Sequence, residues 1–487
     1  MPPPPFAAFG NGRLFFVKDM IRKFLHRHWS GPGGIGALLP IAVPMIVSNI
    51  FDTAMMFVDR LYMSYVGKEH IAACMNGGLT AWSCTIFFVG VISYVSAMVA
   101  RSYGAGHHRE CPVIVSQGLR LGLFAYPVIL LLAFLAAKTF AWAGHDLRQQ
   151  QLETTYFWYS IIGGSLLALL RTPLAAFFSG LGRTRIILWA SLIAMLVNVV
   201  LNYLLIFGKF GFPRLEIAGA AIGTLASSLT VLVILFCSFL AHCRRHGFNF
   251  PASWRHNDSI CRALLKFGFP NGLDGFLGTI SFNAMVTAFH GFGADAAAAV
   301  TIVLNWDLLS FFPLLGTQIG ITTLVGQRLG AGDPQEAERA TFSGLKLNML
   351  YMLFLLFCFV FFARPLVAVF TPDNQGIDYQ AVVNLAVPML RWAAVYLIFD
   401  GCYLAFAGAL RGGGDTFWAM LIGVTFHWVL AGNTLLAIYG FNCSAMTSWR
   451  VWVCSVMLGC PGIYLRFRTG KWKHIKIFAF EQHNSAG

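Results

Sequence analysis

Long apolar segments alternate with short polar connections along this 487-residue chain. Twelve such segments are centred near Val47, Phe88, Leu131, Leu166, Val197, Val231, Met285, Leu309, Leu355, Val395, Val424 and Val453. Each has room for the ~20 apolar residues that cross a bilayer as a helix. Lipid allows only helices or closed barrels to span it, and these segments lack the alternation of barrel strands. The pattern predicts an all-α integral membrane protein with twelve transmembrane helices.

An internal repeat divides these segments into two sets of six. VARSYGAGHHREC begins at Val99, and VGQRLGAGDPQEA begins 226 positions later at Val325, with Gly-Ala-Gly and Glu in step. A repeat set between apolar segments is typical of transporters built from two related bundles that rock about a site between them. We therefore expect pseudo-symmetric six-helix bundles over residues 36–241 and 261–467, joined by a basic cytoplasmic linker at 242–260.

The two ends of the chain are expected to be cytoplasmic tails. In residues 1–35, the segment Arg13–Trp29 places Leu14, Val17 and Ile21 on one helical face and basic residues on another, which predicts an amphipathic helix along the membrane surface. An organelle transit sequence is an alternative interpretation of that segment. Residues 468–487 form a second basic tail.

The composition confines the chain to membrane proteins, because 57% of its residues are hydrophobic and only 11% are charged, against roughly 25% charged in soluble domains. The net charge of +14 invites a nucleic-acid partner, but Lys and Arg are concentrated in alternate connections, where we count Arg101, Arg183, Arg245 and Arg411. The positive-inside rule accounts for that distribution. We expect a multi-pass protein of the cell membrane with both termini cytoplasmic, and no nucleic-acid partner.

Ionisable residues inside the apolar segments are the candidates for function. A carboxylate at membrane depth costs at least ~2.5 kcal/mol unless it is paired, hydrated or protonated. Five residues qualify: Asp52, Asp59, Asp274, Asp307 and Asp400. Asp52 and Asp59 lie seven residues apart, on one face of the first helix. A transporter, a channel or a membrane enzyme could use such residues.

Asp59 has candidate partners elsewhere in the first half. Asn198 and Asn202 lie one helical turn apart in NVVLNYLLIFG, and Thr224 follows in the next apolar segment. Carboxylate, amide and hydroxyl oxygens suit a small cation, or a proton-sharing network when no cation is bound. Taken singly, Asn and Thr more often join membrane helices by hydrogen bonds. Together with Asp59 they favour a cation-coupling site, without a resident metal or other cofactor.

With these motifs in order, the chain resembles the multidrug and toxic compound extrusion family. The resemblance rests on Asp59 in FVD, the two Gly-Ala-Gly repeats, the Asn-x-x-x-Asn helix followed by IFGKFGFPRLEIAGAAIGT, FGFP at Phe267, and Asp400 before GALRGGGDT. It covers the chain from Ile35 to about Arg468. It implies two bundles arranged as a V, and export of amphipathic organic cations in exchange for H⁺ or Na⁺.

The resemblance also implies roles for particular residues. Asp59 is the coupling carboxylate, and Asp400 matches an acidic residue used by the second bundle. Two departures leave the coupling ion open: Asn202 is an Asp in one branch of the family, and Gly278 occupies a position where other members carry Glu. Asp274, one turn before Gly278, either substitutes for that Glu or is a helix-entry residue. Asp52 and Asp307 complete the candidate substrate or second-half coupling residues.

A mechanism follows as a hypothesis. Neutralising Asp59 by a proton or an ion shifts the balance between inward-open and outward-open arrangements of the bundles. Pro40 and Pro44 precede Asp59 and make bending of the first helix easier, because each lacks a backbone donor. Kinks that only fit lipid packing are the alternative interpretation.

Three other functions fit the sequence less well than transport does. A flippase for lipid-linked oligosaccharide would need basic residues in its cavity for the pyrophosphate, and Asp outnumbers them here if Arg171 and Arg391 are discounted. No nucleophile, metal or phosphate-loop motif indicates an enzyme. Channel pores usually combine several subunits, whereas this chain already holds two halves, so we expect a monomer.

Overall fold

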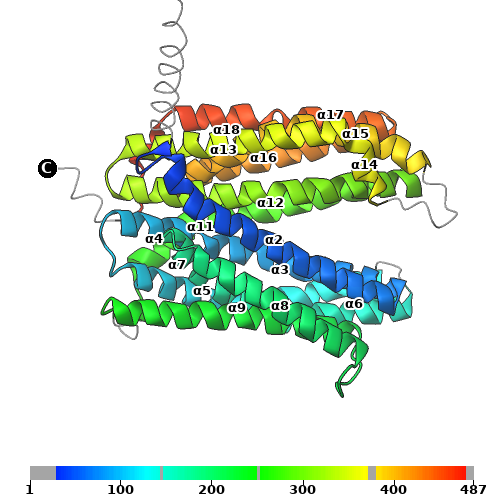
Figure 1. The fold of residues 1–487 in the computed structure, drawn as a ribbon, viewed down its shortest axis with the longest axis horizontal. Coiled ribbons are helices and arrows are strands. Elements are labelled where there is room, and N and C mark those ends of the chain that lie inside the picture. Colours follow the sequence, from blue (N-terminus) through cyan, green and yellow to red (C-terminus); the bar gives the residue numbers. More distant parts are fainter. Residues whose placement is uncertain (1–28, 143–145, 249–252, 371–379, 479–487) are drawn as a thin grey trace, which may run out of the picture.

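A computed structural model describes residues 29–142, 146–248, 253–370 and 380–478, and every regular element within those ranges is helical (Figure 1). The first half contains α2 (Ile35–Val66), α3 (Lys68–Ser93), α4 (Val95–Gly104), α5 (Cys111–Trp142), α6 (Leu147–Tyr159), the π-helix η1 (Ser160–Ser165), α7 (Leu166–Gly180), α8 (Arg185–Phe207) and α9 (Ile217–Arg245). The second half contains α11 (Asp258–His290), α12 (Ala294–Gly330), α13 (Pro334–Phe361), α14 (Ala363–Ala368), α15 (Gln380–Gly413), α16 (Thr416–Leu435), the π-helix η3 (Leu436–Gly440), α17 (Ala445–Val456), α18 (Gly459–Arg468) and the short 3₁₀ helix η4 (Lys471–His474). The amphipathic helix predicted at Arg13–Trp29 lies, apart from its last residue, outside the described residues.

The twelve predicted spans are recovered, although three of them are interrupted. Among the described residues, ten segments are long and apolar enough to cross a membrane, and α11 and the α17–α18 pair run alongside them in Figure 1. Tyr94 separates α3 from α4, and η1 separates α6 from α7. The all-α, twelve-helix fold is thus confirmed.

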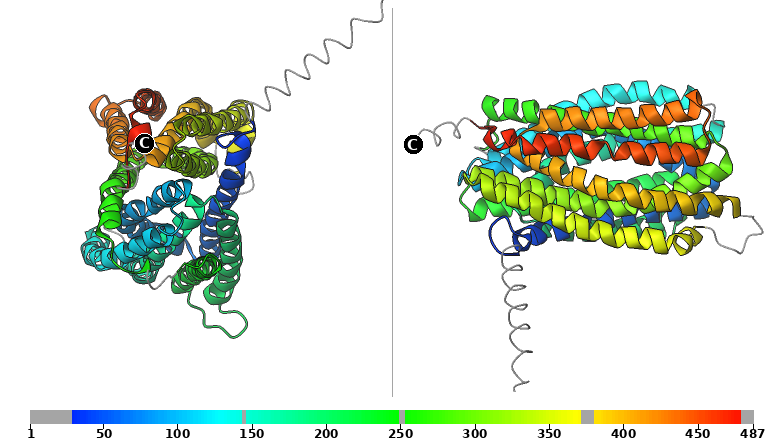
Figure 2. Two further views of the ribbon diagram at one scale, coloured as in Figure 1. Left: turned by 90° about the vertical axis from the view of Figure 1, so that its left-hand side faces the viewer. Right: turned by 90° about the horizontal axis from the view of Figure 1, so that it is seen from above.

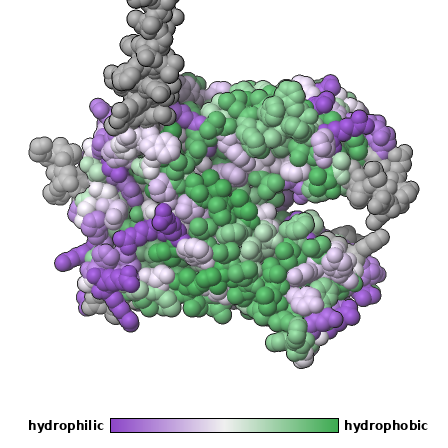
Figure 3. All heavy atoms as spheres, in the orientation of Figure 1, coloured by the Kyte–Doolittle hydropathy of each residue, from purple (hydrophilic) through white to green (hydrophobic). Residues whose placement is uncertain are grey.

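On the face drawn in Figure 3, a broad apolar belt lies between two hydrophilic ends. Many large apolar side chains of the long helices are exposed, among them Phe124, Leu131 and Leu350, which are 77%, 67% and 70% exposed. Such side chains gain nothing from water, so the belt is the surface that contacts lipid hydrocarbon.

The helices form two lobes, and Figure 2 shows how they are arranged in cross-section. In Figures 1 and 3 the lobe containing α12–α18 parts from the lobe containing α2–α9 at the end of the molecule away from the C-terminus. The contacts between lobes are reciprocal: α2 packs on α12, and α11 packs on α3. This is the pseudo-symmetric pair of bundles that the repeat predicts, in the V-shaped arrangement that the family resemblance implies.

The repeated Gly-Ala-Gly segments meet where the lobes join. A Cβ atom on Gly104 of α4 would lie 2.0 Å from the carbonyl oxygen of Gln327, and one on Gly330 of α12 would lie 2.1 Å from that of Arg101. Arg101 and Gln327, like Gly104 and Gly330, are 226 positions apart. The contact is therefore made twice with the partners exchanged, as across a two-fold axis, and only glycine allows backbones this close.

The prolines of α2 leave a carbonyl group without its helical donor. Pro44 has no N–H for the carbonyl oxygen of Pro40, and the buried Thr184 hydroxyl fills the gap at 3.1 Å, also lying 3.0 Å from the Ile41 oxygen. Thr184 precedes α8. The Pro40 carbonyl oxygen thus accepts a hydrogen bond from the residue that precedes α8 instead of from the backbone of α2.

Two arginines lie elsewhere than the sequence predicts, and the first part of the C-terminal segment is packed. Arg101 and Arg411, counted with the connections, lie inside α4 and α15 and are hydrogen-bonded to protein groups. The C-terminal tail predicted from residue 468 is packed over its first part, since Trp472 is fully buried against Gly413. The charges of both arginines are used within the fold and not on the surface.

Candidate functional site

Asp59 lies in the first lobe at the centre of a buried polar network. Its side chain is 6% exposed, and Asn198 and Asn202 are fully buried. The Asn202 side-chain amide donates to Asp59 Oδ1, and Thr224 Oγ1 lies 3.1 Å from Asp59 Oδ2. Asn202 Nδ2 also reaches Asn198 Oδ1 at 3.3 Å. All four predicted residues are therefore brought together, by α2, α8 and α9.

This network has two complementary hydrogen-bond arrangements. Thr224 has a single hydroxyl hydrogen, and two acceptors are in reach: Asp59 Oδ2 and, at 3.0 Å, the Ala220 carbonyl oxygen. An ionised Asp59 can accept that hydrogen. A protonated Asp59 can instead donate to Thr224 Oγ1 while the Thr224 hydrogen turns to Ala220. Gain or loss of one proton thus reorganises the contact between α2 and α9.

The same network also offers oxygen ligands. Asn202 Oδ1 is buried without a hydrogen-bond partner among the described residues, and it lies against Gly223, where a Cβ would come within 1.9 Å. Glycine at 223 therefore lets α9 approach α8 closely. Because Asn202 directs its Nδ2 at Asp59, this oxygen joins the carboxylate as a hard ligand for a small cation only when the amide turns over.

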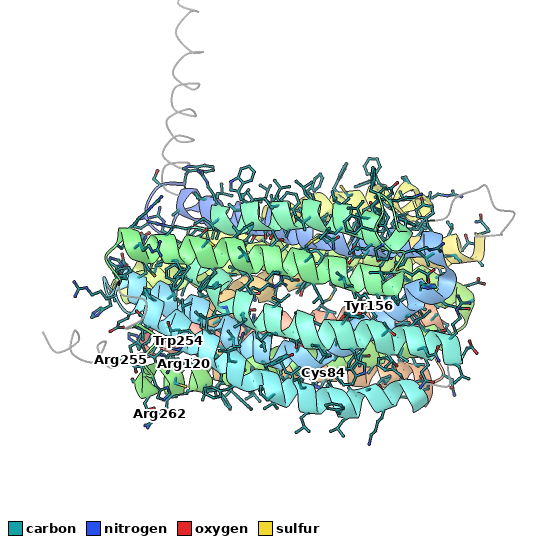
Figure 4. All side chains as sticks on the ribbon, turned by 90° about the horizontal axis from the view of Figure 1, so that it is seen from below. Cys84, Arg120, Tyr156, Trp254, Arg255 and Arg262 are labelled. Atoms are coloured by element: carbon teal, nitrogen blue, oxygen red, sulfur yellow. The ribbon has the colours of Figure 1, made fainter. Side chains whose placement is uncertain are left out.

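Sequence reasoning missed two polar residues of α6. Tyr156 is 7% exposed and makes side-chain contacts with Thr224 and Cys74, beside the Asp59 network. Figure 4 places it towards the end of the molecule opposite Arg255 and Arg262. Glu153, one turn earlier, is fully buried and accepts from Asn76 at 2.8 Å. Their spacing of three residues on one helix was the available signal.

In the second lobe, Asp307 and Asp400 form a separate acidic site. The Tyr396 hydroxyl of α15 donates to Asp307 Oδ1 of α12. Asp400, one turn beyond Tyr396, interacts electrostatically with Asp307. All three are polar groups within apolar helices. Because two neighbouring carboxylates repel when both are charged, this site favours a proton or a cation between them.

Asp274 is held in an ion pair. Arg411 Nη2 donates to Asp274 Oδ2 at 2.6 Å, linking α11 to α15. The Asp274 side chain is 8% exposed and that of Arg411 is 24% exposed. The second carboxylate oxygen of Asp274, Oδ1, is buried without a hydrogen-bond partner in the described part of the chain. The charge of Asp274 is thus already balanced by protein.

Asp52 faces a cavity of about 550 Å³ between the lobes. The wall is formed by α2, α3, α4, α7, α8 and α9 on one side and by α11, α12 and α15 on the other. Its charged residues are Asp52, Arg171 and Arg411. Arg171, discounted from sequence, therefore lines the cavity.

The eight predicted site residues fall into three groups: the Asp59 network, the Asp307–Asp400 pair, and Asp52 and Asp274 at the cavity and its adjoining ion pair.

The sequence is similar to known families and proteins over most of its length. The family model MatE matches residues 44–204 and 270–431. A probable multidrug resistance protein NorM from a Synechococcus species is 32% identical over 415 residues, covering 83% of this chain and 87% of that protein. The probable multidrug resistance protein NorM of Thermotoga maritima is 23% identical over 92% of this chain and 96% of its own.

Solved structures share the fold at low sequence identity. A MATE protein in the straight conformation superposes with a TM-score of 0.79 at 18% identity, over 92% of this chain and 98% of the other. A MOP superfamily transporter from Pyrococcus furiosus gives 0.80 at 18% identity, over 93% and 99%, and was described as having a binding pocket of reverse polarity that suggests a different function. These likenesses concern the arrangement of helices.

Proposed function

Since the chain belongs to the MatE family, whose members are transporters and not enzymes, we propose that it is a secondary active multidrug efflux antiporter. It exports amphipathic organic cations in exchange for H⁺ or Na⁺ by alternating access. The protein is a multi-pass membrane protein, and we place it in the cell membrane with both termini in the cytoplasm. Because one chain supplies both lobes, it acts as a monomer.

The Asp59 network is the observation that carries this proposal. A carboxylate buried in a membrane helix is stable only when its charge is compensated. Here Asn202 and Thr224 supply hydrogen bonds from two other helices. Binding of a proton or Na⁺ changes those bonds, and α2 also packs on α12 of the other lobe. The ion thereby favours one arrangement of the lobes over the other.

The second lobe supplies a further charged site. Asp307 and Asp400 accept a proton or a cation, or the basic group of the substrate, whereas Asp274 is already paired with Arg411. We assign Asp274 to holding α11 against α15 and not to binding the coupling ion. Asp52 receives the basic group of a substrate in the central cavity.

A flippase for lipid-linked oligosaccharide or a similar amphiphile is the second candidate function. It is favoured by the two arginines on the cavity wall, Arg171 and Arg411, because guanidinium groups bind phosphates. Arg411 is occupied by Asp274, which leaves one arginine for a diphosphate. We therefore rank this function below drug export.

The test uses everted membrane vesicles and a fluorescent organic cation, with a Na⁺ gradient and a pH gradient imposed separately. We expect one gradient to drive concentrative dye uptake and its collapse to abolish that uptake. Equal dye entry under either gradient or none would contradict antiport. In parallel, translocation of a fluorescent lipid-linked diphosphate without any gradient, at a rate above protein-free vesicles, would favour the flippase.

A further inference from the structure

The central cavity contains two opposite charges that are near each other without being bonded. Asp52 of α2 and Arg171 of α7 line the same space and interact electrostatically. Within the described residues, no carboxylate oxygen lies within 4.0 Å of the Arg171 guanidinium, and the guanidinium makes no hydrogen bond. A charged group at membrane depth is unfavourable without compensation. The Arg171 guanidinium has a charge partner in Asp52 but no direct contact with it, so it offers a place on the cavity wall for an acidic group from a ligand.

Two more polar atoms of the cavity lack partners. Asp52 Oδ1 and Gln318 Nε2 are buried without a hydrogen bond among the described residues, and the Gln318 side chain is nearly inaccessible. Arg411 differs from Arg171, because its guanidinium is already bonded to Asp274 at 2.6 Å. The cavity thus presents one anion, one cation and one amide donor that the fold does not use, and they come from α2, α7 and α12.

The remaining wall determines what kind of molecule can reach these groups. Apolar side chains from both lobes surround them, including Trp82, Val89, Val231, Leu315 and Ile319. The formal charges of Asp52 and Arg171 cancel, as do those of Arg411 and its partner Asp274, so the site does not favour a simple cation over a zwitterion. A monocation bound at Asp52 would lie beside the unpaired Arg171. A molecule with both an acidic and a basic group would compensate both residues.

We infer that this cavity selects amphipathic zwitterions, with Arg171 binding the acidic group of the substrate and Asp52 its basic group. Gln318 donates to the acidic group or to a neutral acceptor on the same molecule. The inference rests on the proposed function, since it takes the preferred substrates of the same exporter to be molecules whose cationic group is accompanied by an acidic group. Arg171 is then a specificity-determining residue, which distinguishes zwitterions from cations of the same shape.

A matched pair of dyes separates charge from size. One is a xanthene dye with a free carboxylate and a cationic chromophore, and the other is its methyl ester, which keeps the chromophore and loses the negative charge. Initial rates of gradient-driven uptake are measured in proteoliposomes containing the full chain. We expect the wild type to transport the acid faster than the ester. We expect Arg171→Gln to lower the acid-to-ester ratio about tenfold or more, as for a lost charge-assisted hydrogen bond.

Controls separate this role from a structural one. Arg171→Lys retains the charge and should restore part of the ratio. Arg148→Ala removes an arginine whose side chain is 69% exposed and pairs with Glu69, so the ratio should stay at the wild-type value. Equal losses for acid and ester in Arg171→Gln, or a wild-type preference for the ester, would overturn the inference.

A binding measurement keeps the inference testable if transport fails. Should the wild type move neither dye under any gradient, the proposed function is wrong, and equilibrium binding of both dyes to detergent-solubilised protein is followed by fluorescence anisotropy. Tighter binding of the acid by the wild type, reversed in Arg171→Gln, would still support zwitterion recognition. An acid-to-ester ratio of Kd values that Arg171→Gln leaves unchanged would reject it.

Discussion

Asp59→Asn tests the coupling role most directly, because the amide has the shape of the carboxylate without its charge. Hydrogen bonds to a charged acceptor contribute about 1.5–3 kcal/mol and those to a neutral one about 0.5–1.5 kcal/mol. The two bonds from Asn202 and Thr224 therefore weaken by about 2–3 kcal/mol in total. A loss of that size lowers the factor by which the bound ion favours one lobe arrangement over the other by about 30- to 150-fold.

The fold should survive this change. An asparagine at 59 can accept from Asn202 through its oxygen and donate to Thr224 through its nitrogen, with the Thr224 hydrogen turned to Ala220. We expect gradient-driven uptake of a fluorescent cation in everted vesicles to fall by the factor above. Exchange of labelled for unlabelled substrate at equal concentrations, which needs no ion gradient, should persist.

The control is Asp295→Asn, which makes the same chemical change at an exposed position in the first turn of α12. It should leave both assays at wild-type rates. The coupling role of Asp59 would be refuted by undiminished ion-driven accumulation in Asp59→Asn. Loss of exchange together with loss of uptake, in a protein that unfolds at the wild-type temperature, would point instead to a role in substrate binding.

Further substitutions test other features of the structure. Gly104→Ala should destabilise the junction of the lobes by about 1–3 kcal/mol through overpacking, lowering the unfolding temperature in detergent, whereas Gly432→Ala, with no atom within 4 Å of the added carbon, should not. Thr184→Val should cost about 1–3 kcal/mol by leaving the carbonyl freed by the α2 proline without a donor, and Thr184→Ser should restore thermal stability. Tyr396→Phe removes the donor to Asp307 and should reduce ion-driven uptake about tenfold; unchanged uptake would exclude a coupling role for this tyrosine.

Part of the first-lobe network could be predicted because two of its residues are related by a rule that acts within one helix. Asn198 and Asn202 are four residues apart, so they share a face, and a buried Asp59 needs partners. The twelve spans follow from apolar length alone. Tyr156 was not predicted, because its approach to Thr224 depends on how α6 packs beside α9.

Arg171 was misjudged for a related reason. The helix that carries it, α7, is apolar over most of its surface, so periodicity cannot distinguish its cavity face from its lipid face. The breaks at Tyr94 and at Ser160–Ser165 were also absent from the prediction. Hydropathy does not register a change of helix type when the flanking residues stay apolar.

The contact of Gly104 with Gln327 is repeated, with the halves exchanged, by the contact of Gly330 with Arg101, as in a symmetric dimer. A half-length ancestor could have formed it as a homodimer, in which one position would have served both copies. In the present chain the two equivalent side chains make different contacts: Arg101 donates to the Ile475 oxygen at 2.7 Å, while Gln327 donates to the Gly180 oxygen at 2.8 Å. The backbone junction is thus the same in both halves, so one chain can keep a symmetric joint while using its two copies of the side chain differently.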